Sequence, residues 1–92
     1  MHFLGELRIV AEEKRKYYKS YVIAVHPEFL VDYQKWHISF SLERHHGSHV
    51  NIRKFYTKVE DKSLFDSEKD AIKYSFVAGA QTIDRGVGLE DM

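Results

Sequence analysis

The sequence contains no cysteine. Without thiols there is no disulfide framework, no thiolate zinc site and no cysteine nucleophile, so these classes of protein are excluded. The sequence also lacks any apolar run near the roughly 20 residues that a membrane-spanning helix needs. Its first residues carry an acid, Glu6, where a signal peptide would carry bases. The simplest interpretation is a cytoplasmic protein that has no contact with a membrane.

Neither sign of charge is in excess, because 14 basic and 14 acidic residues give a net charge of zero. The charges are unevenly spread along the chain. Residues 14–58 hold nine bases, three acids and five of the six histidines, whereas residues 59–92 hold four bases and eight acids. The middle of the chain is therefore basic, and its positive charge rises as the pH falls through about 6.5, where histidine titrates.

The length of 92 residues suffices for one domain, which we expect to span residues 1–92 with its compact part at about 17–86. Apolar residues make up 43% of the chain and charged residues 30%. This balance is typical of a folded globular domain and argues against a disordered chain.

The first half of the chain contains one helical pattern and one strand pattern. Residues 3–16 carry apolar side chains at helical spacing, which predicts an N-terminal helix, although residues 7–11 also fit a short strand. Residues 20–26 are rich in β-branched and aromatic side chains and end at the only proline, Pro27. They predict a strand that stops there. Residues 27–35 have the position of a loop, although several of them are apolar.

The clearest pattern lies in residues 36–44, where apolar residues at 36, 38, 40 and 42 alternate with polar residues at 37, 39, 41 and 43. A period of two predicts a strand with one face buried and the other in water. Residues 45–49 then form the tip of a hairpin, and residues 50–57 form the return strand.

The length of the hairpin turn decides which side chains face the core. A two-residue turn at 47–48 would put Val50 and Ile52 on the wet face. A three-residue loop at 46–48 keeps both with the buried face, and we favour this register. A bulge near 53–54 then accounts for the break in the alternation that follows.

The second half of the chain predicts one long helix. Residues 58–66 form a polar connection, and Asp66 or Ser67 is a suitable N-cap. The helix extends to about Arg85 and ends at Gly86. Several residues of one helix face are small, which allows close packing against a sheet.

These elements predict an α+β fold in the order α-β-β-β-α. A three-stranded antiparallel sheet would pack against the C-terminal helix, with the N-terminal helix beside it. We expect residues 87–92 to fray.

Histidines at the hairpin tip raise the question of a metal site. His45, His46 and His49 lie within five residues, and imidazole is a common metal ligand. His45 and His46 would point to opposite faces of a strand, so at most two rings converge, His45 with His49. A solvated polar turn is the better interpretation, and we expect neither a metal nor a cofactor.

A serine, a histidine and an acid also share one strand face, because His37, Ser39, Ser41 and Glu43 alternate with apolar residues. Acyl transfer needs oxyanion donors and a pocket besides these groups, and the sequence shows neither. Phosphate-binding glycine loops and zinc-protease motifs are also missing. We therefore predict that the protein is not an enzyme.

The basic part of the chain provides a candidate surface for nucleic acid. A run of bases is interleaved with the rings of Tyr17 and Tyr18, and cations beside stacking rings are typical of such surfaces. The candidate phosphate contacts are Lys14, Arg15, Lys16, Lys19, Arg53 and Lys54. A solvated end of a helix is the alternative interpretation.

Apolar residues in the expected loop provide a second candidate surface. The candidate contacts with a protein partner, or with a second copy of the chain, are Phe29, Leu30, Tyr33 and Trp36. The alternative is that this loop folds over the end of the core.

Two families resemble this chain. The predicted element order resembles a double-stranded-RNA-binding domain, a family with a lysine-rich motif at the start of its last helix. Only Lys69 matches that motif here.

Residues 17–86 are similar to the HlyU-type family of small bacterial regulators. The matching residues are Tyr18, Tyr21, Ile23, Phe65, Asp66, Ser67, Ala71, Ile83 and Asp84. This resemblance implies one sheet with one helix and a role in bacterial transcriptional regulation, and it brings no catalytic residues.

The expectation for function is therefore a non-enzymatic bacterial binding or regulatory module that acts by protein contact, with a homodimer among its forms. Nucleic-acid binding through the basic residues is the alternative, and metal binding by histidine is the least favoured reading.

Overall fold

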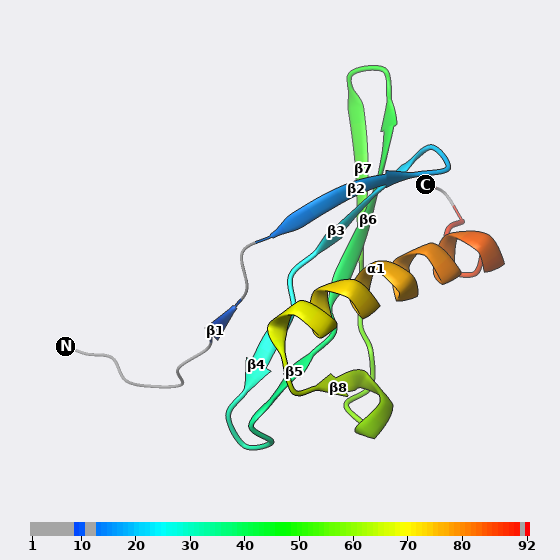
Figure 1. Ribbon diagram of the computed structural model, residues 1–92. Coiled ribbons are helices and arrows are strands. Elements are labelled where there is room, and N and C mark those ends of the chain that lie inside the picture. The colour runs from blue at the N-terminus through cyan, green and yellow to red at the C-terminus, as the bar shows by residue number, and fades with distance from the viewer. Residues whose placement is uncertain (1–8, 11–12, 91) are drawn as a thin grey trace.

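In the computed structural model, which describes residues 9–10, 13–90 and 92, one long helix lies across a pair of antiparallel sheets (Figure 1). The strands are β1 (Ile9–Val10), β2 (Lys14–Tyr18), β3 (Tyr21–Val25), β4 (Glu28–Leu30), β5 (Lys35–His37), β6 (Phe40–His46), β7 (His49–Phe55) and β8 (Leu64–Phe65). A single turn of 3₁₀ helix, η1 (Asp61–Ser63), precedes β8, and helix α1 (Glu68–Arg85) follows it. No helix in the described part of the chain is both long and apolar enough to cross a membrane.

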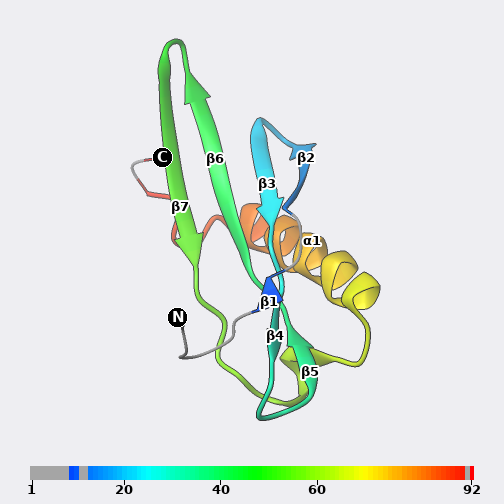
Figure 2. The same cartoon turned by 90° about the vertical axis from the view of Figure 1, so that its left-hand side faces the viewer.

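The two sheets are joined by two bent segments, one formed by β3 and β4 and the other by β5 and β6, and we call this pair of segments the ribbon. One sheet has the order β1-β4-β5-β8 and the other the order β2-β3-β6-β7. Strand β3 continues into β4 past Pro27, and β5 continues into β6 past Ser39, as Figure 2 shows. Because Pro27 has no N–H group, the ladder is interrupted there, as the sequence predicted. The adjacent His26 N–H donates to the Ser39 carbonyl at 3.0 Å, which holds the ribbon together at the bend.

The predicted N-terminal helix is wrong where the chain is described. Ile9–Val10 and Lys14–Tyr18 are strands, and residues 1–8 and 11–12 lie outside the described residues. Strand β2 pairs with β3 along its whole length, from Lys14 with Val25 to Tyr18 with Tyr21. This pairing overrides the helical spacing of the apolar side chains, because β3 satisfies the backbone N–H and carbonyl groups of alternate residues of β2.

The predicted three-stranded sheet is also too small, since each of the two sheets has four strands among the described residues. The segment 27–35, expected to be a loop, contains β4 and the turn that joins it to β5. The predicted strand over 36–44 is divided at Ile38 and Ser39, where the ribbon bends.

The favoured register of the β6–β7 hairpin is wrong as well. His46 pairs with His49 across a two-residue turn, and the register continues without a bulge to Phe40 and Phe55. Gly47 has φ 60° and Ser48 has an ordinary φ, a combination that suits the type II′ turns of tight hairpins. The geometry of the turn therefore determines the register, against the alternation of apolar and polar residues, and Glu43 pairs with Ile52.

Helix α1 begins and ends as the sequence predicted. The Ser67 side chain accepts a hydrogen bond from the Asp70 N–H at 3.1 Å, and Gly86 ends the helix with φ 73°. A left-handed residue at this position favours glycine. The buried positions are spaced four apart and form one line along the helix: Ala71, Ser75, Gly79 and Ile83.

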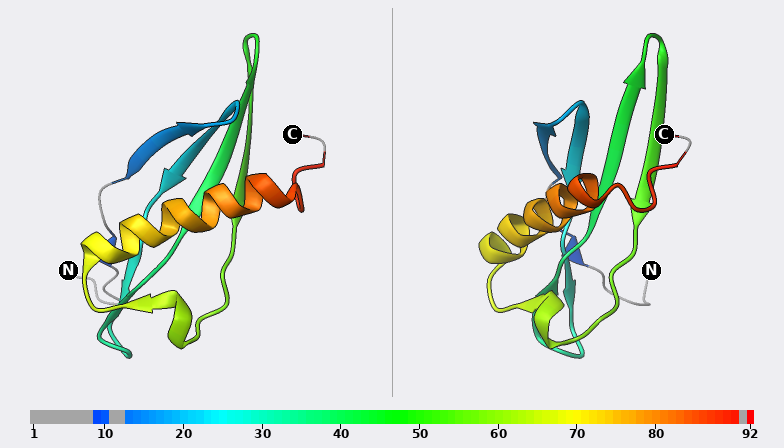
Figure 3. Two further views of the ribbon diagram at one scale, coloured as in Figure 1. Left: turned by 45° about the vertical axis from the view of Figure 1, so that its right-hand side comes forward. Right: turned by 90° about the vertical axis from the view of Figure 1, so that its right-hand side faces the viewer.

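This line of small residues lets α1 lie very close to the sheet. The Ser75 hydroxyl, fully buried, accepts a hydrogen bond from the Ser39 N–H at 3.1 Å. At Gly79, an added Cβ would lie 2.7 Å from Cγ2 of Ile23. The helix therefore packs its own backbone against β3, and Figure 3 shows it crossing one face of the sheet. The core between them contains Tyr21, Ile23, Val25, Phe40, Leu42 and Ile83.

The chain returns to the sheet after α1, so the expected fraying of residues 87–92 is not seen in the part that is described. Leu89 and Met92 pack against the core, and the Arg53 guanidinium donates a hydrogen bond to the Gly88 carbonyl. Arg53 belongs to β7, so this contact ties the C-terminal residues to an edge strand.

The β2–β3 turn is fastened to the end of α1. The Lys19 ammonium lies 2.7 Å from the Asp84 carboxylate, and the Tyr18 hydroxyl donates to the same carboxylate at 3.0 Å. These contacts lower the pKa of Asp84. The turn residues Lys19 and Ser20 have φ 45° and 73°, which is a left-handed conformation that side chains disfavour.

We expect Gly79→Ala to destabilise the protein. Overpacking typically costs about 1–3 kcal/mol, which exceeds the gain of about 1 kcal/mol in helix propensity. Urea unfolding measures the free energy difference. In an Ile23→Ala background, which removes the clashing Cγ2, Gly79→Ala should no longer lower the free energy of unfolding. A Gly79→Ala protein as stable as the wild type would contradict the close contact.

We expect Ser20→Gly to stabilise the protein by about 1 kcal/mol, because glycine adopts the left-handed conformation without strain. The matched control is Ser48→Gly in the other two-residue turn, where φ is ordinary. That change should give no gain, since it only adds freedom to the unfolded chain. Thermal unfolding of the three proteins tests this, and equal gains from both changes would refute the assignment of strain to Ser20.

Candidate binding face

One face of the second sheet is turned away from α1, and we call it the open face. The cross-strand register sets out its residues in two neighbouring rows. One row is Arg15, Ala24, Ser41 and Lys54, and the next is Tyr17, Val22, Glu43 and Ile52. The helix covers the opposite face, where Ile23 and Leu42 lie.

The centre of the open face is buried although it is partly polar. Ser41 and Glu43 are only 9% and 6% exposed, and Val22 and Ala24 beside them are buried too. The sequence predicted that the polar alternate residues from His37 to Glu43 face water, and this is wrong. Ser41 and Glu43 lie on β6, a central strand of the second sheet, and Glu43 is bound by Arg15 of the edge strand β2.

A buried carboxylate is neutralised at this centre. Arg15 binds the Glu43 carboxylate and also binds Glu13 at 2.9 Å. His45 Nε2 lies 3.7 Å from the same carboxylate of Glu43. The hydrogen bonds to Glu43 and then to Glu13 raise the pKa of Arg15. A buried charge needs a partner of opposite charge, so Arg15 stabilises the sheet by neutralising Glu43.

Apolar side chains surround this centre and face solvent. Tyr17 is 82% exposed, Ile52 is 64% exposed, and Tyr56, just after β7, is 86% exposed. Val50 is 43% exposed on the same side of β7. These side chains come from the two edge strands and the residues next to them. They give the open face an apolar surface that no described element covers.

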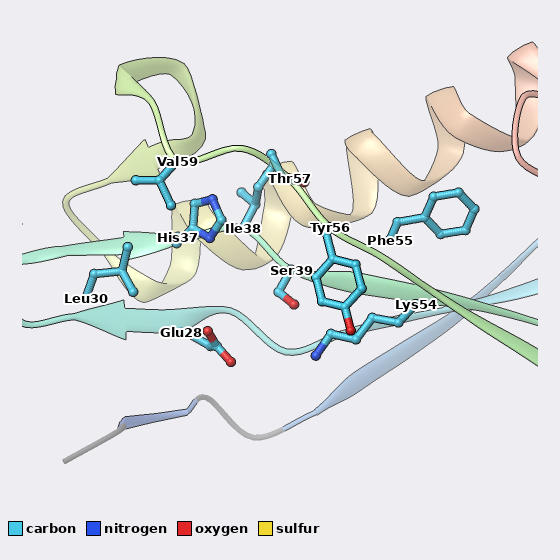
Figure 4. Close-up of a pocket in the computed structure, with 10 residues that line it drawn as sticks. All are labelled: Glu28, Leu30, His37, Ile38, Ser39, Lys54, Phe55, Tyr56, Thr57 and Val59. Atoms are coloured by element: carbon cyan, nitrogen blue, oxygen red, sulfur yellow. The ribbon is translucent and has the colours of Figure 1, made fainter. Parts of the chain in front are cut away.

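A cleft of about 430 Å³ opens where the ribbon bends. Its walls come from β4 and β5 on one side and from the end of β7 on the other, as Figure 4 shows. Lys54 and Tyr56 lie together on one wall, with the ammonium 5.7 Å from the ring centre. Glu28, Leu30 and the Val59 side chain form the opposite wall (Figure 4).

Two histidines lie at this bend with buried nitrogens. His37 Nε2 and His26 Nδ1 have no hydrogen-bond partner among the described residues. Burial and then the nearby positive charge of Lys54 lower the pKa of His26, and they outweigh the opposing influence of Glu13 and Glu28. The neutral form of His26 is therefore favoured in the folded protein.

The structure does not bring the six candidate bases together. Arg15 and Lys54 lie on the open face, while Arg53 lies on the opposite face, beside the end of the chain. Lys19 is paired with Asp84. Lys14 and Lys16 lie on the helix side of β2, where the Lys16 ammonium is 5.0 Å from the ring centre of Phe76. The basic part of the chain is thus several separate surfaces.

The four candidate partner contacts lie near one another in the first sheet. Phe29 and Trp36 pair across β4 and β5, with ring centres 5.3 Å apart in an edge-to-face arrangement. Both are half-buried, as is Leu30, whereas Tyr33 in the turn is 54% exposed. Most of this cluster therefore contributes to packing, and the exposed part is the turn.

The two candidate metal ligands do not converge. His45 pairs with Val50 and lies on the open face, whereas His49 pairs with His46 and lies on the other side of the hairpin. Among the described residues, no three or more side chains of histidine, aspartate or glutamate are grouped to hold a metal ion.

The exposed apolar residues of the open face were not identified as a site from the sequence. The available signal was the Gly47-Ser48 pair, since a two-residue turn there sends Val50 and Ile52 to the face away from the core. Nothing local indicates that Tyr17 joins them, because that depends on the pairing of β2.

Comparison of the chain with protein-family models, with curated proteins and with solved structures gives no significant match in any of the three. The geometry of the molecule therefore carries the functional argument.

The lowered pKa of His26 predicts a loss of stability in acid. The unfolded chain binds a proton at its ordinary pKa of about 6.5, above that of the folded protein, so stability falls as the pH drops through this value. We expect His26→Asn to reduce this slope in urea unfolding, with His46→Asn at the exposed hairpin tip as the matched control.

An NMR titration provides the second measurement of the same effect. In a Lys54→Gln variant the pKa of His26 should rise toward its ordinary value. The positive charge of Lys54, which after burial is the second cause of the lowered pKa, is then removed. An unchanged titration of His26 in that variant would rule out Lys54 as a cause.

Proposed function

We propose that the protein is a non-enzymatic binding module that acts by contact with another protein, and that its contact surface is the side of the open face that lies along β7. The single observation that supports this most strongly is the exposure of Val50, Ile52 and Tyr56 on one face of the sheet, along or just after its edge strand β7. Aromatic and aliphatic side chains around a desolvated centre are typical of protein interfaces.

A second copy of the chain is the occupant that we propose. The net charge of zero means that two copies do not repel each other. Strand β7 is an edge strand among the described residues, and it carries Val50 and Ile52. An exposed edge with apolar residues favours pairing with another strand.

The charges of β7 allow such pairing about its own middle. If two β7 strands pair antiparallel with Ile52 facing its counterpart, then Val50 faces Lys54 and Asn51 faces Arg53 of the second copy. No like charges are opposed in this register, which removes the usual penalty for edge pairing. The two open faces would then form one continuous surface.

The contacts of Glu43 support the proposal that the protein is not an enzyme. A serine–histidine–acid arrangement needs a carboxylate that orients the histidine. Glu43 is instead bound to Arg15 and lies beside His45 on β6, whereas His37 belongs to β5 of the other sheet. The regulatory role that the HlyU-type resemblance implies remains a proposal for the same contact surface.

We expect the wild-type protein to associate as its concentration rises, with little dependence on salt, because apolar contacts dominate. Ile52→Glu should weaken this association at least about tenfold, since it places two carboxylates at the centre of the interface. Sedimentation velocity measures both. The matched control is Val31→Glu, a half-exposed valine in the β4–β5 turn.

The absence of cysteine provides a test of geometry. Opposed residues of an antiparallel pair lie about 5.5 Å apart, within the range that a disulfide spans. Ile52→Cys should therefore form a covalent dimer on mild oxidation, whereas the exposed Val87→Cys should not. A wild-type protein that stays monomeric at every concentration would rule out the second copy as occupant.

A further inference from the structure

A groove runs between the free edge of β2 and the neighbouring side of α1. We propose that this groove binds an extended, glutamate-rich segment of a partner protein, which adds to β2 as an antiparallel strand. The groove lies on the helix side of β2 and not on the open face, and the inference does not require self-association through β7.

The edge of β2 is available for an added strand. Strand β2 pairs only with β3 among the described residues, and its first four residues are exposed. In a hairpin with a two-residue turn, the pair next to the turn exchanges both hydrogen bonds, and alternate pairs do so along the strands. Tyr18 and Lys16 thus bond toward β3, and Arg15 and Tyr17 turn their N–H and carbonyl groups outward.

The groove beside this edge has basic walls and an apolar floor. A hollow of about 360 Å³ is lined by Lys14 of β2 and by Glu68, Lys69 and Ile72 of α1. One helical turn further on, the Lys16 ammonium lies over the ring of Phe76. Ile72 and Phe76 are half-buried and pack against the core, so they are fixed in place.

The charges that remain in the groove favour an acidic occupant. Arg15 and Lys19 are already paired with carboxylates, whereas Lys14, Lys16 and Lys69 make no ion pair with any described residue. Against these three cations stands one acid, Glu68. Lysines on an edge strand hinder pairing with a like strand and attract an acidic one.

A glutamate-rich peptide fits this surface better than the phosphate backbone of a nucleic acid does. Its two methylene groups can cover Ile72 and Phe76 while the carboxylate reaches the lysines, in the way that long charged side chains commonly pack. The outward N–H and carbonyl groups of Arg15 and Tyr17 are matched by a peptide backbone, which gives strand addition its affinity. A nucleic acid would leave these groups without a matching ladder.

The probe is a fluorescent peptide of about eight residues, longer than a typical strand, in which glutamate and valine alternate. In the proposed antiparallel register, the glutamates share the helix side with Lys14 and Lys16, and the valines face the same side as Arg15 and Tyr17. Fluorescence anisotropy should show binding that weakens as salt is raised, whereas a peptide of alternating lysine and valine should not bind.

Methylation of the peptide backbone tests strand addition. In an antiparallel pair, residues that are directly opposite share a face, so the valine N–H groups bond to Arg15 and Tyr17. N-methylation of the valines should abolish binding, and N-methylation of the glutamates, whose N–H groups point away, should leave it intact. Equal binding of the two methylated peptides would overturn the proposal.

Charge reversal tests the location. Lys14→Glu with Lys16→Glu should weaken binding at least about tenfold, since two attractive contacts become repulsive. Lys58→Glu with Lys62→Glu changes the net charge equally in the connection after β7 and should have no effect. Circular dichroism confirms that each variant is folded, and equal weakening by both pairs would overturn the assigned site.

Two further outcomes separate this inference from the alternatives. Single-stranded DNA that binds more tightly than the peptide, with the same loss on changing Lys14 and Lys16, would overturn the proposal in favour of a nucleic-acid surface. Ile52→Glu should leave peptide binding unchanged. A failure of self-association together with intact peptide binding would therefore affect the proposed function alone.

Discussion

The close approach of α1 to the central strands is the constraint on which the rest of the structure depends. At Gly79 the helix backbone lies against the Ile23 side chain, and at Ser75 a buried hydroxyl accepts the N–H of Ser39. Ser39 is also the residue whose carbonyl is bonded to His26 across the bend. The same few residues therefore fix the position of the helix and the curvature of the ribbon.

Because a single long helix covers one face of the sheet, the opposite face must be closed by its own side chains. The buried Glu43 is neutralised by Arg15, and the small residues Ala24 and Ser41 are buried in the row between Arg15 and Lys54. The apolar side chains of the edge strands are left in solvent around this polar centre. That arrangement gives a monomer little advantage, and it becomes favourable when another surface removes the apolar area from water.

The two edge strands differ in a way that suits two kinds of contact. Strand β2 carries consecutive bases, which discourage pairing between identical strands, whereas β7 carries Val50 and Ile52 with bases only toward its end. The helix lies beside β2 and adds Lys69 and Phe76 to its edge. Position relative to the helix, and not composition alone, makes one edge a basic groove and the other part of an apolar face.

Signals that act within a few residues were sufficient for several elements. Ser67 and Gly86 delimit α1, and Pro27 ends β3, because a cap, a left-handed residue and a missing N–H act locally. The α+β class and the antiparallel hairpin after residue 36 follow from the same kind of signal. The small residues of α1 correctly indicated a close helix–sheet contact, although not that Ile23 and Ser39 would form it.

The tertiary structure decided what depends on partners far along the chain. Residues 14–18 became a strand because β3 lies beside them, and no local pattern reveals that neighbour. The register of β7 placed Val50 and Ile52 away from the core, since the type II′ geometry at Gly47 determines parity for the whole strand. The sequence by itself determined the ends of elements, where the physical cause is local, and only tertiary pairing decided which side chains meet on each surface.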